Sequence, residues 1–377
     1  MTGLPVKVLH LYSGNRFGGA ETYLLTLARQ RKLCPEMEHA FALCFKGLLS
    51  ESLDSLGVPC DILGPARLSR PWTVWKVRRR LRRLLKATAP DVVFCHSYWP
   101  QVVLGPAVLK AGVPLAYRST DVPRGGDWLE KAASRVRPRL IVANSANTAD
   151  SIRQHVYPDI PVKVVYNPVD DRTPDDPPEV RKRIRQLLGV EPEQVVFIVA
   201  SRLVRLKGLH VLVQALSRLS GRADWQCWIA GGAQDEQEQA YAAELRDLAL
   251  KQGVGDRIQL LGQRQDVPDL LCAADVYCQP NIEPDAFGIV FIEALYAGLP
   301  IVTSELGGPV EILDDTCGLL LPPGDDAKLA SVLGELLDNP ELRRHLADAG
   351  PVRAKALSDP SRQMRLLYET LSSIVGG

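Results

Sequence analysis

The sequence predicts an α/β protein with two domains, each built around its own parallel sheet. The chain has 377 residues, too many for one ordinary core and suited to two domains of roughly 100 to 200 residues each. Short apolar runs alternate with segments of helical period along the whole chain, as in βα units whose sheet is buried on both faces. Between the halves, residues 167–180 (NPVDDRTPDDPPEV) lack periodicity, which indicates a surface linker.

The predicted strands are short runs rich in apolar and β-branched residues. In the first half they lie at 6–12, 40–45, 91–96, 115–118, 140–144 and 162–166. In the second half they lie at 195–201, 226–230, 258–261, 276–279, 301–303 and 318–321. The last segment, 362–375, has apolar residues at helical spacing, and we expect it to pack back on the first domain. The predicted division is therefore 1–170, 171–358 and a C-terminal helix at 359–377.

Composition excludes some classes of function. Lys and Arg number 45 against 44 Asp and Glu, so the net charge of +1 gives no drive toward nucleic acid. The eight cysteines are dispersed without a CxxC pair, which is typical of core residues in a reducing compartment. The N-terminus lacks the pattern of a signal peptide, and no apolar run is long enough to span a membrane. We expect a cytoplasmic protein.

A glycine-rich loop, SGNRFGGAETYLLTLAR at 13–29, follows the first strand and opens a helix. Gly14, Gly18 and Gly19 remove side chains where backbone amides could approach a ligand, and a helix start favours anions. The loop is neither GxGxxG nor a P-loop. A tight turn with no ligand explains the same glycines.

Two cations follow a strand of the second half in ASRLVRLKGLHVLVQAL, 200–216. Arg202 and Lys207 lie near the carboxyl end of that strand, where doubly wound sheets bind ligands. Such a pair can neutralise a diphosphate, Arg as a planar fork and Lys as a point charge. The alternative is a solvated loop.

Three acids stand in NIEPDAFGIVFIEALYAGLP, 281–300: Glu283, Asp285 and Glu293. The helix that starts at 286–289 is apolar around nearly its whole circumference, so Glu293 needs a hydrogen-bond partner. Sugar or ribose hydroxyls suit a carboxylate, and the alternative is neighbouring backbone. Asp285 either binds a ligand or caps the helix start.

His96 ends the strand DVVFCH, again at the carboxyl end. In that position it either faces a ligand or serves the core as a structural histidine.

Together these segments resemble the retaining glycosyltransferases of family 4, which have the GT-B fold. In the family's order the chain also carries IVANSANTADSI, VVYNPVD, WIAGG, IQLLGQRQDVPDLLCAADVYCQPN, AGLPIVTSELGGPVEIL and GLLLPPGD. The resemblance covers nearly the whole chain. It implies two Rossmann-like, doubly wound domains facing an interdomain cleft, the first binding the acceptor and the second a nucleotide-diphosphate sugar such as a UDP- or GDP-sugar.

The family's E-x7-E pair appears in this chain as D-x7-E, from Asp285 to Glu293. The resemblance implies that Glu293 accepts from ribose hydroxyls and that Asp285, shorter by one methylene, holds hydroxyls of the transferred sugar. Glu283 falls outside the frame as a solvated neighbour or a second contact.

The resemblance assigns further residues. The implied catalytic residues are His96, Asp285, Arg202 and Lys207. The implied donor-binding residues are Gly18, Gly19, Arg202, Lys207, Gly262, Arg264, Phe287, Gly288, Ile289 and Glu293, with the amides of 287–289 at the sugar and diphosphate. For the acceptor we expect loops at Tyr98, Trp99 and Asp121. Where many members have His-Asp, this chain has Thr120-Asp121, so that histidine's role is lost.

The resemblance implies sugar transfer with retention of configuration, no cofactor and no metal ion. Two rival functions stay open: a GT-B sugar-nucleotide epimerase and a non-catalytic module that binds sugar nucleotides. The basic segment 72–86 (WTVWKVRRRLRRLLK) either packs on its own sheet with a solvated face or touches an anionic membrane that carries a lipid acceptor. The second alternative would place the protein at the inner membrane face, and the acceptor is a glycan, a lipid or a small molecule.

Overall fold

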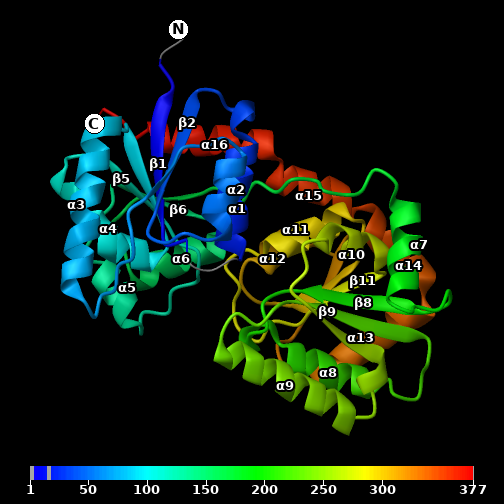
Figure 1. The fold of residues 1–377 in the computed structure, drawn as a ribbon. Coiled ribbons are helices and arrows are strands. Elements are labelled where there is room, and N and C mark those ends of the chain that lie inside the picture. The colour runs from blue at the N-terminus through cyan, green and yellow to red at the C-terminus, as the bar shows by residue number, and fades with distance from the viewer. Residues whose placement is uncertain (1–3, 15–17, 377) are drawn as a thin grey trace. The chain divides into compact units, whose positions relative to one another are not determined.

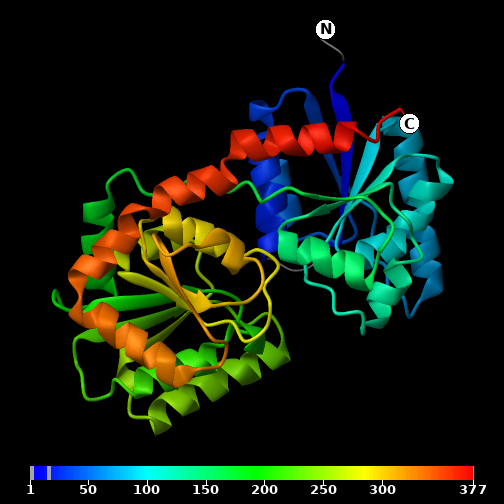
Figure 2. The ribbon, with the colours of Figure 1, turned by 180° about the vertical axis from the view of Figure 1, so that it is seen from behind.

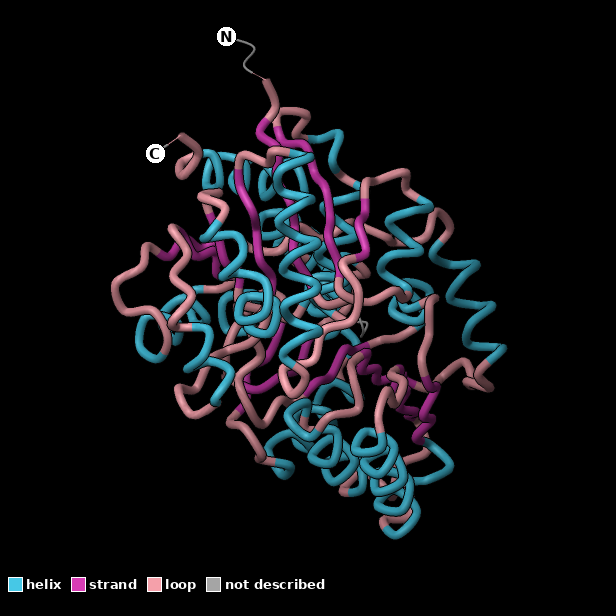
Figure 3. The backbone as a smooth tube through the Cα atoms, turned by 60° about the vertical axis from the view of Figure 1, so that its left-hand side comes forward, coloured by secondary structure: helices cyan, strands magenta, loops and turns pink. Residues whose placement is uncertain are grey.

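The computed structural model describes residues 4–14 and 18–376. They form two compact units: unit 1 is the chain up to Val169 together with the segment from Ser358, and unit 2 is Asp170–Leu357. Each unit has one parallel sheet with helices on both faces (Figure 1), and the tube view shows the strands of each sheet between helices (Figure 3). The predicted α/β class with two sheets is confirmed.

Unit 1 has a seven-stranded sheet in the order β3-β2-β1-β4-β5-β6-β7. Its strands are β1 (Val6–Tyr12), β2 (Met37–Leu43), β3 (Cys60–Ile62), β4 (Val92–His96), β5 (Leu115–Arg118), β6 (Leu140–Ala143) and β7 (Val162–Val164). Six of these were predicted, although β2 begins and ends earlier than 40–45. The sequence analysis missed β3 because its three residues, none of them fully buried, make too short an apolar run.

The helices of unit 1 follow its strands in βα order. They are α1 (Gly19–Arg29), η1 (Arg31–Leu33), α2 (Leu48–Ser55), α3 (Pro71–Thr88), α4 (Tyr98–Lys110), α5 (Trp128–Ala133), α6 (Ala146–His155) and α16 (Pro360–Ser372). Helix α16, at the red end of the chain, lies beside the blue N-terminal elements in the view from behind (Figure 2). Its residues Met364, Leu367 and Leu371 are buried, and Arg365 pairs with Glu36 at 3.0 Å.

Unit 2 has a six-stranded sheet in the order β10-β9-β8-β11-β12-β13. Its strands are β8 (Val195–Ala200), β9 (Trp225–Ala230), β10 (Ile258–Gly262), β11 (Val276–Gln279), β12 (Ile301–Ser304) and β13 (Gly318–Leu321). All six were predicted to within two residues at either end. All six residues of β8 are buried, as expected for a parallel strand covered on both faces.

The helices of unit 2 begin with α7 inside the predicted linker. They are α7 (Pro177–Leu187), η2 (Arg205–Lys207), α8 (Leu209–Ser217), α9 (Glu236–Lys251), η3 (Gly255–Arg257), α10 (Val267–Ala273), α11 (Ile289–Tyr296), α12 (Pro309–Ile312), α13 (Asp326–Asp338) and α14 (Pro340–Asp348). Helix α15 (Gly350–Ser358) then leads along the chain to α16.

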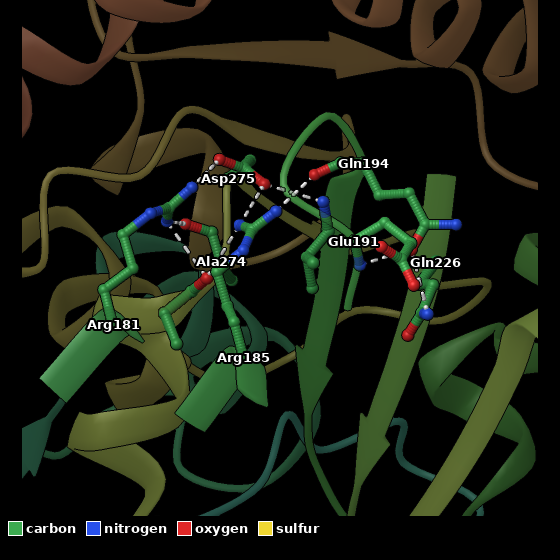
Figure 4. Close-up of polar contacts among 9 residues, drawn as sticks. Arg181, Arg185, Glu191, Gln194, Gln226, Ala274 and Asp275 are labelled. Carbon is green, nitrogen blue, oxygen red and sulfur yellow. Dashed lines mark hydrogen bonds and ion pairs between the residues drawn. The ribbon is translucent and has the colours of Figure 1, made fainter. Parts of the chain in front are cut away.

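An acidic anchor joins the two central strands of unit 2 at their amino ends. Asp275, which precedes β11, accepts from the backbone amide of Val196 at 2.7 Å and from Arg185 Nη1 at 3.0 Å. Arg181 Nη2 donates to its other oxygen, and Figure 4 shows both arginines reaching Asp275 from α7. The anchor thus ties α7, β8 and β11 together at the edge of the sheet opposite the strands' carboxyl ends.

Asp275→Asn should lower the free energy of unfolding of unit 2 by about 2 kcal/mol, because Arg181 and Arg185 both lose their counter-ion and Arg185 is only 11% exposed. Urea unfolding followed by tryptophan fluorescence measures this loss. The exposed acid Asp256 is the matched control, and Asp256→Asn should change stability by less than about 0.5 kcal/mol. Equal losses in the two variants would contradict the anchor.

Candidate functional site

The strand order of unit 2 reverses at β8, with β9 and β10 on one side and β11, β12 and β13 on the other. Ligands of doubly wound sheets bind at the carboxyl ends of the strands beside such a switch point. The segment after β8 carries Arg202 and Lys207, and the loop after β11 carries Asp285. The topology therefore brings together two segments that the sequence singled out separately, one with Arg202 and Lys207 and the other with Asp285.

Lys207 and Asp285 are in direct contact. Lys207 Nζ donates to Asp285 Oδ2, and their side chains are 16% and 18% exposed. The backbone holds the two segments together, since the amide of Ile282 donates to the carbonyl of Leu206 at 2.9 Å. The site thus presents one partly buried cation beside one partly buried carboxylate.

Asp285 does not cap the helix that follows it. Helix α11 begins at Ile289, and its N-cap is Gly288, which provides no side-chain hydrogen bond. The interpretation of Asp285 as a helix cap is therefore wrong. The loop that carries Asp285 is fixed by two glycines instead: Gly308 donates to the carbonyl of Asp285 at 2.8 Å, and a Cβ on Gly307 would lie 2.5 Å from that carbonyl oxygen.

Arg202 is held by a carboxylate that the sequence analysis missed. Glu238 Oε1 accepts from Arg202 Nε at 3.1 Å and from Nη2 at 2.5 Å, and its other oxygen accepts from the amide of Gln234. Glu238 stands three residues after Asp235, the N-cap of α9, so D-x-x-E was the available signal of a fixed glutamate. Glu238 is 3% exposed and Arg202 is 42% exposed, so the arginine is oriented but accessible.

Glu293 lies on α11 and has a cationic partner that the sequence analysis did not predict. Arg172, from the segment that precedes α7, donates through Nη2 to Glu293 Oε1. A small hollow in unit 2 surrounds the pair and is lined by Asp170, Arg172, Thr173, Pro268, Leu271, Glu293 and Ala297. Burial raises the pKa of Glu293, and Arg172 opposes that rise.

Arg172→Ala should destabilise unit 2 in a pH-dependent manner. A carboxyl whose pKa is raised by folding takes up a proton on folding, so its favourable contribution is complete below the unfolded pKa and is lost as the pH rises through the folded pKa. Without Arg172 the pKa of Glu293 rises further. The free energy of unfolding should fall by about 1–2 kcal/mol near neutral pH, and urea unfolding should show this loss shrinking as the pH is lowered through the acidic range.

The matched control for that measurement is Arg183, whose pair with Asp269 is more exposed, at 55% and 29%. Arg183→Ala should lower stability by less than about 1 kcal/mol, with little dependence on pH. A loss in Arg172→Ala that stays constant with pH would contradict the role assigned to Glu293.

The other predicted donor residues of unit 2 lie on two of its segments, 287–289 and 262–264. Phe287 is buried, Gly288 has φ +91°, and Ile289 is the first residue of α11. Gly262 ends β10 with φ +68°, and Arg264 forms an ion pair with Asp266 at 2.6 Å. The amides at 287–289 thus lie at a helix N-terminus, the environment predicted for them.

Unit 1 has its own switch point between β1 and β4. His96 ends β4, and Gly18 is the N-cap of α1 in the segment after β1. Residues 15–17 of the predicted glycine loop lie outside the described residues. Gly14 has φ +84° and a Cβ there would lie 2.9 Å from the carbonyl oxygen of Phe45, so it serves a tight turn; Gly19 is exposed, with no atom within 4 Å of a Cβ.

Tyr98 and Trp99 were expected in a loop, and that conformation is wrong, whereas their assignment to the acceptor stays a prediction. Helix α4 begins at Tyr98, whose side chain packs in the core beside Tyr117, and Trp99 packs against Phe45. The apolar strand and the apolar helix join through a single residue, so no loop forms there. Asp121 is exposed after β5, where Thr120 Oγ1 donates to Asp121 Oδ2 at 3.0 Å.

Two family models match this chain. The family model described as "Glycosyl transferases group 1" matches residues 180–353, and that described as "Glycosyltransferase Family 4" matches residues 17–173. The structure of Anabaena Alr3699/HepE in complex with UDP and glucose superposes with a TM-score of 0.86 at 25% identity, over 98% of this chain and 100% of that one.

Two curated relatives are mannosyltransferases. The lipopolysaccharide core biosynthesis mannosyltransferase LpsB of Rhizobium meliloti (strain 1021) is 24% identical over 309 residues, 80% of each chain. The phosphatidyl-myo-inositol mannosyltransferase of Mycobacterium leprae (strain TN) is 37% identical over 173 residues, so the match spans 44% of that relative. The predicted family and the predicted two-domain, Rossmann-like fold are both confirmed: the chain belongs to the family 4-like glycosyltransferases of the GT-B fold.

Proposed function

We propose that this enzyme moves a sugar from a nucleotide-diphosphate sugar to a hydroxyl of an acceptor, with retention of configuration and without a metal ion. The observation that carries the proposal is the contact between Lys207 and Asp285 at the switch point of unit 2, with Arg202 in the same segment as Lys207. A cation for the diphosphate and a carboxylate for sugar hydroxyls are thereby adjacent.

In this proposal, the charge that develops on the leaving diphosphate is stabilised by Lys207, by Arg202 and by the amides that begin α11. Glu238 limits the rotamers of Arg202, which reduces the entropy lost when the guanidinium binds a phosphate. The departing phosphate oxygen takes the acceptor's proton, so no further protein base is needed.

Asp285 and Glu293 divide the remaining contacts in the proposal. Asp285 accepts from hydroxyls of the sugar while Lys207 binds the adjoining phosphate, so their ion pair loosens when the donor enters. Glu293 accepts from ribose hydroxyls. Because Arg172 already contacts one oxygen of Glu293, the ribose either shares this carboxylate or displaces the arginine.

The relatives support a hexose donor. Anabaena Alr3699/HepE has structures with UDP and with UDP-glucose, and one relative from Corynebacterium glutamicum is named as GDP-mannose-dependent. The relatives are named as glycosyltransferases, which favours sugar transfer over the epimerase and over the non-catalytic module. Gly262 and Arg264 remain the proposed neighbours of the nucleotide base.

The acceptor and the membrane contact are also proposals. Helix α3 buries the stripe Val74, Val77, Leu81 and Leu85, while Trp72 and Trp75 are 59% and 55% exposed among its cations. Exposed tryptophan beside Lys and Arg suits an anionic membrane surface. In the part of the chain that the structure describes, no helix is both long and apolar enough to cross a membrane.

A thermal-shift panel of UDP-, GDP- and ADP-sugars tests the donor. One nucleotide should raise the melting temperature, because a ligand that binds only the folded state stabilises it by mass action. The bound sugar nucleotide is then incubated without acceptor, and the products are examined by NMR. Rapid interconversion of two sugar nucleotides, or the absence of a shift with every donor, would contradict the proposed function.

A further inference from the structure

Three buried histidines of unit 1 form one hydrogen-bonded chain. His10 Nδ1 lies 3.0 Å from His96 Nε2, and His10 Nε2 lies 2.9 Å from His39 Nδ1. None of the three is more than 4% exposed. These hydrogen bonds connect His39, in the interior of the sheet, to His96, the residue at the carboxyl end of β4.

The parallel sheet creates this alignment. His10 on the central strand β1 is opposite Phe41 of β2 and Phe94 of β4. His39 stands two residues before Phe41 and His96 two residues after Phe94, so all five rings lie on one face. The rings of Phe41 and Phe94 pack on the ring of His10 at centroid distances of 4.8 and 5.8 Å. They shield the hydrogen bonds between the three histidines from water.

Only two proton arrangements satisfy both hydrogen bonds. Burial lowers the pKa of all three histidines, so each ring is neutral and carries one proton. Each link needs one N–H and one lone pair. Either all three rings carry the proton on Nε2, or all three carry it on Nδ1, because any mixture sets two protons or two lone pairs against each other.

The two ends of the chain are open. His96 Nδ1 and His39 Nε2 are buried, and neither has a hydrogen-bond partner among the described residues. Arg118, opposite His96 on β5, is fully buried, whereas Arg31, the cation near His39, is partly exposed. A cation acts more strongly where water is excluded, so Arg118 favours a lone pair rather than a proton at the His96 end.

We propose that His39 and His10 are positioning residues that hold His96 in its Nε2–H tautomer, so that His96 Nδ1 carries a lone pair and is the hydrogen-bond acceptor at the carboxyl end of β4. A buried acceptor without a partner requires a donor, and this one stands at the switch point of unit 1. This coupling does not depend on the proposed function.

The coupling is tested by ¹⁵N NMR of protein labelled at its six histidines, without ligand. In the wild type, His96 Nδ1 should have the shift of an unprotonated nitrogen. His39→Leu removes the acceptor for His10 Nε2–H, so His10 should move its proton to Nδ1 and thereby drive His96 to the Nδ1–H tautomer. His39→Asn, which can again offer an acceptor oxygen, should restore the wild-type tautomer.

Phe41→Leu is the packing control, since it loosens the same face and leaves both links intact. It should leave the tautomer of His96 unchanged. A protonated Nδ1 in the wild type, or the same His96 tautomer in wild type and His39→Leu, would overturn the coupling.

Discussion

Lys207→Met should slow the release of nucleoside diphosphate from the sugar donor about 100-fold or more, the usual effect of removing one group that stabilises transition-state charge. The ammonium loses its role at the diphosphate, and Asp285, which is 18% exposed, loses its ion pair with Lys207. Binding of the nucleoside diphosphate should weaken about tenfold. Initial rates and calorimetric titration measure the two effects separately.

Arg205 offers a matched control two residues away in the same 3₁₀ turn. Its ion pair with Glu244 is open to water, at 62% and 46% exposure, so its charge is well screened. Arg205→Met should keep the rate within about twofold of the wild type. A normal rate in Lys207→Met, or an equal loss in Arg205→Met, would remove Lys207 from the diphosphate site.

Gly208→Ala should destabilise unit 2 by about 3–5 kcal/mol and misplace Lys207. Gly208 has φ +67°, and a Cβ there would lie 1.8 Å from the carbonyl oxygen of Pro280. The backbone carbonyl of Pro280 cannot move aside as the end of a flexible side chain can. The segment after β8 must therefore move away from the loop after β11. The melting temperature and the affinity for nucleoside diphosphate should therefore fall together.

Gly189→Ala distinguishes the effect of the close contact with Pro280 from the effect of a positive φ. Gly189 has φ +66°, but no atom lies within 4 Å of a Cβ at this exposed position. Gly189→Ala should lower the free energy of unfolding only by the cost of holding alanine in the left-handed conformation, about 1–2 kcal/mol. The affinity for the nucleotide should not change. If the two alanine variants lost equal stability, the contact with Pro280 would not matter.

The sequence predicted the strands well because a parallel strand buried on both faces leaves a continuous apolar run. The run at 195–200 is the clearest case, since every residue of β8 is buried. The short strand β3 lacked such a run and was missed. The sequence also predicted an acceptor loop where α4 begins, because it shows which residues are polar or aromatic without showing which way Tyr98 points.

By itself the sequence determined which side chains stand at the ends of strands or in the segments that follow them, among them Arg202, Lys207 and His96. These positions follow from local periodicity and from the order of apolar runs. The spacing from Asp285 to Glu293 is likewise a property of the chain alone.

Only the tertiary structure decided the partners of these residues. Arg202 meets Glu238 across 36 residues, Glu293 meets Arg172 across 121, and His96 meets His10 across 86. A local pattern carries no information on such pairs, because strand order and loop packing bring them within hydrogen-bond distance. What each buried charge or imidazole can do at pH 7 depends on that partner, since burial without it would shift the pKa unopposed.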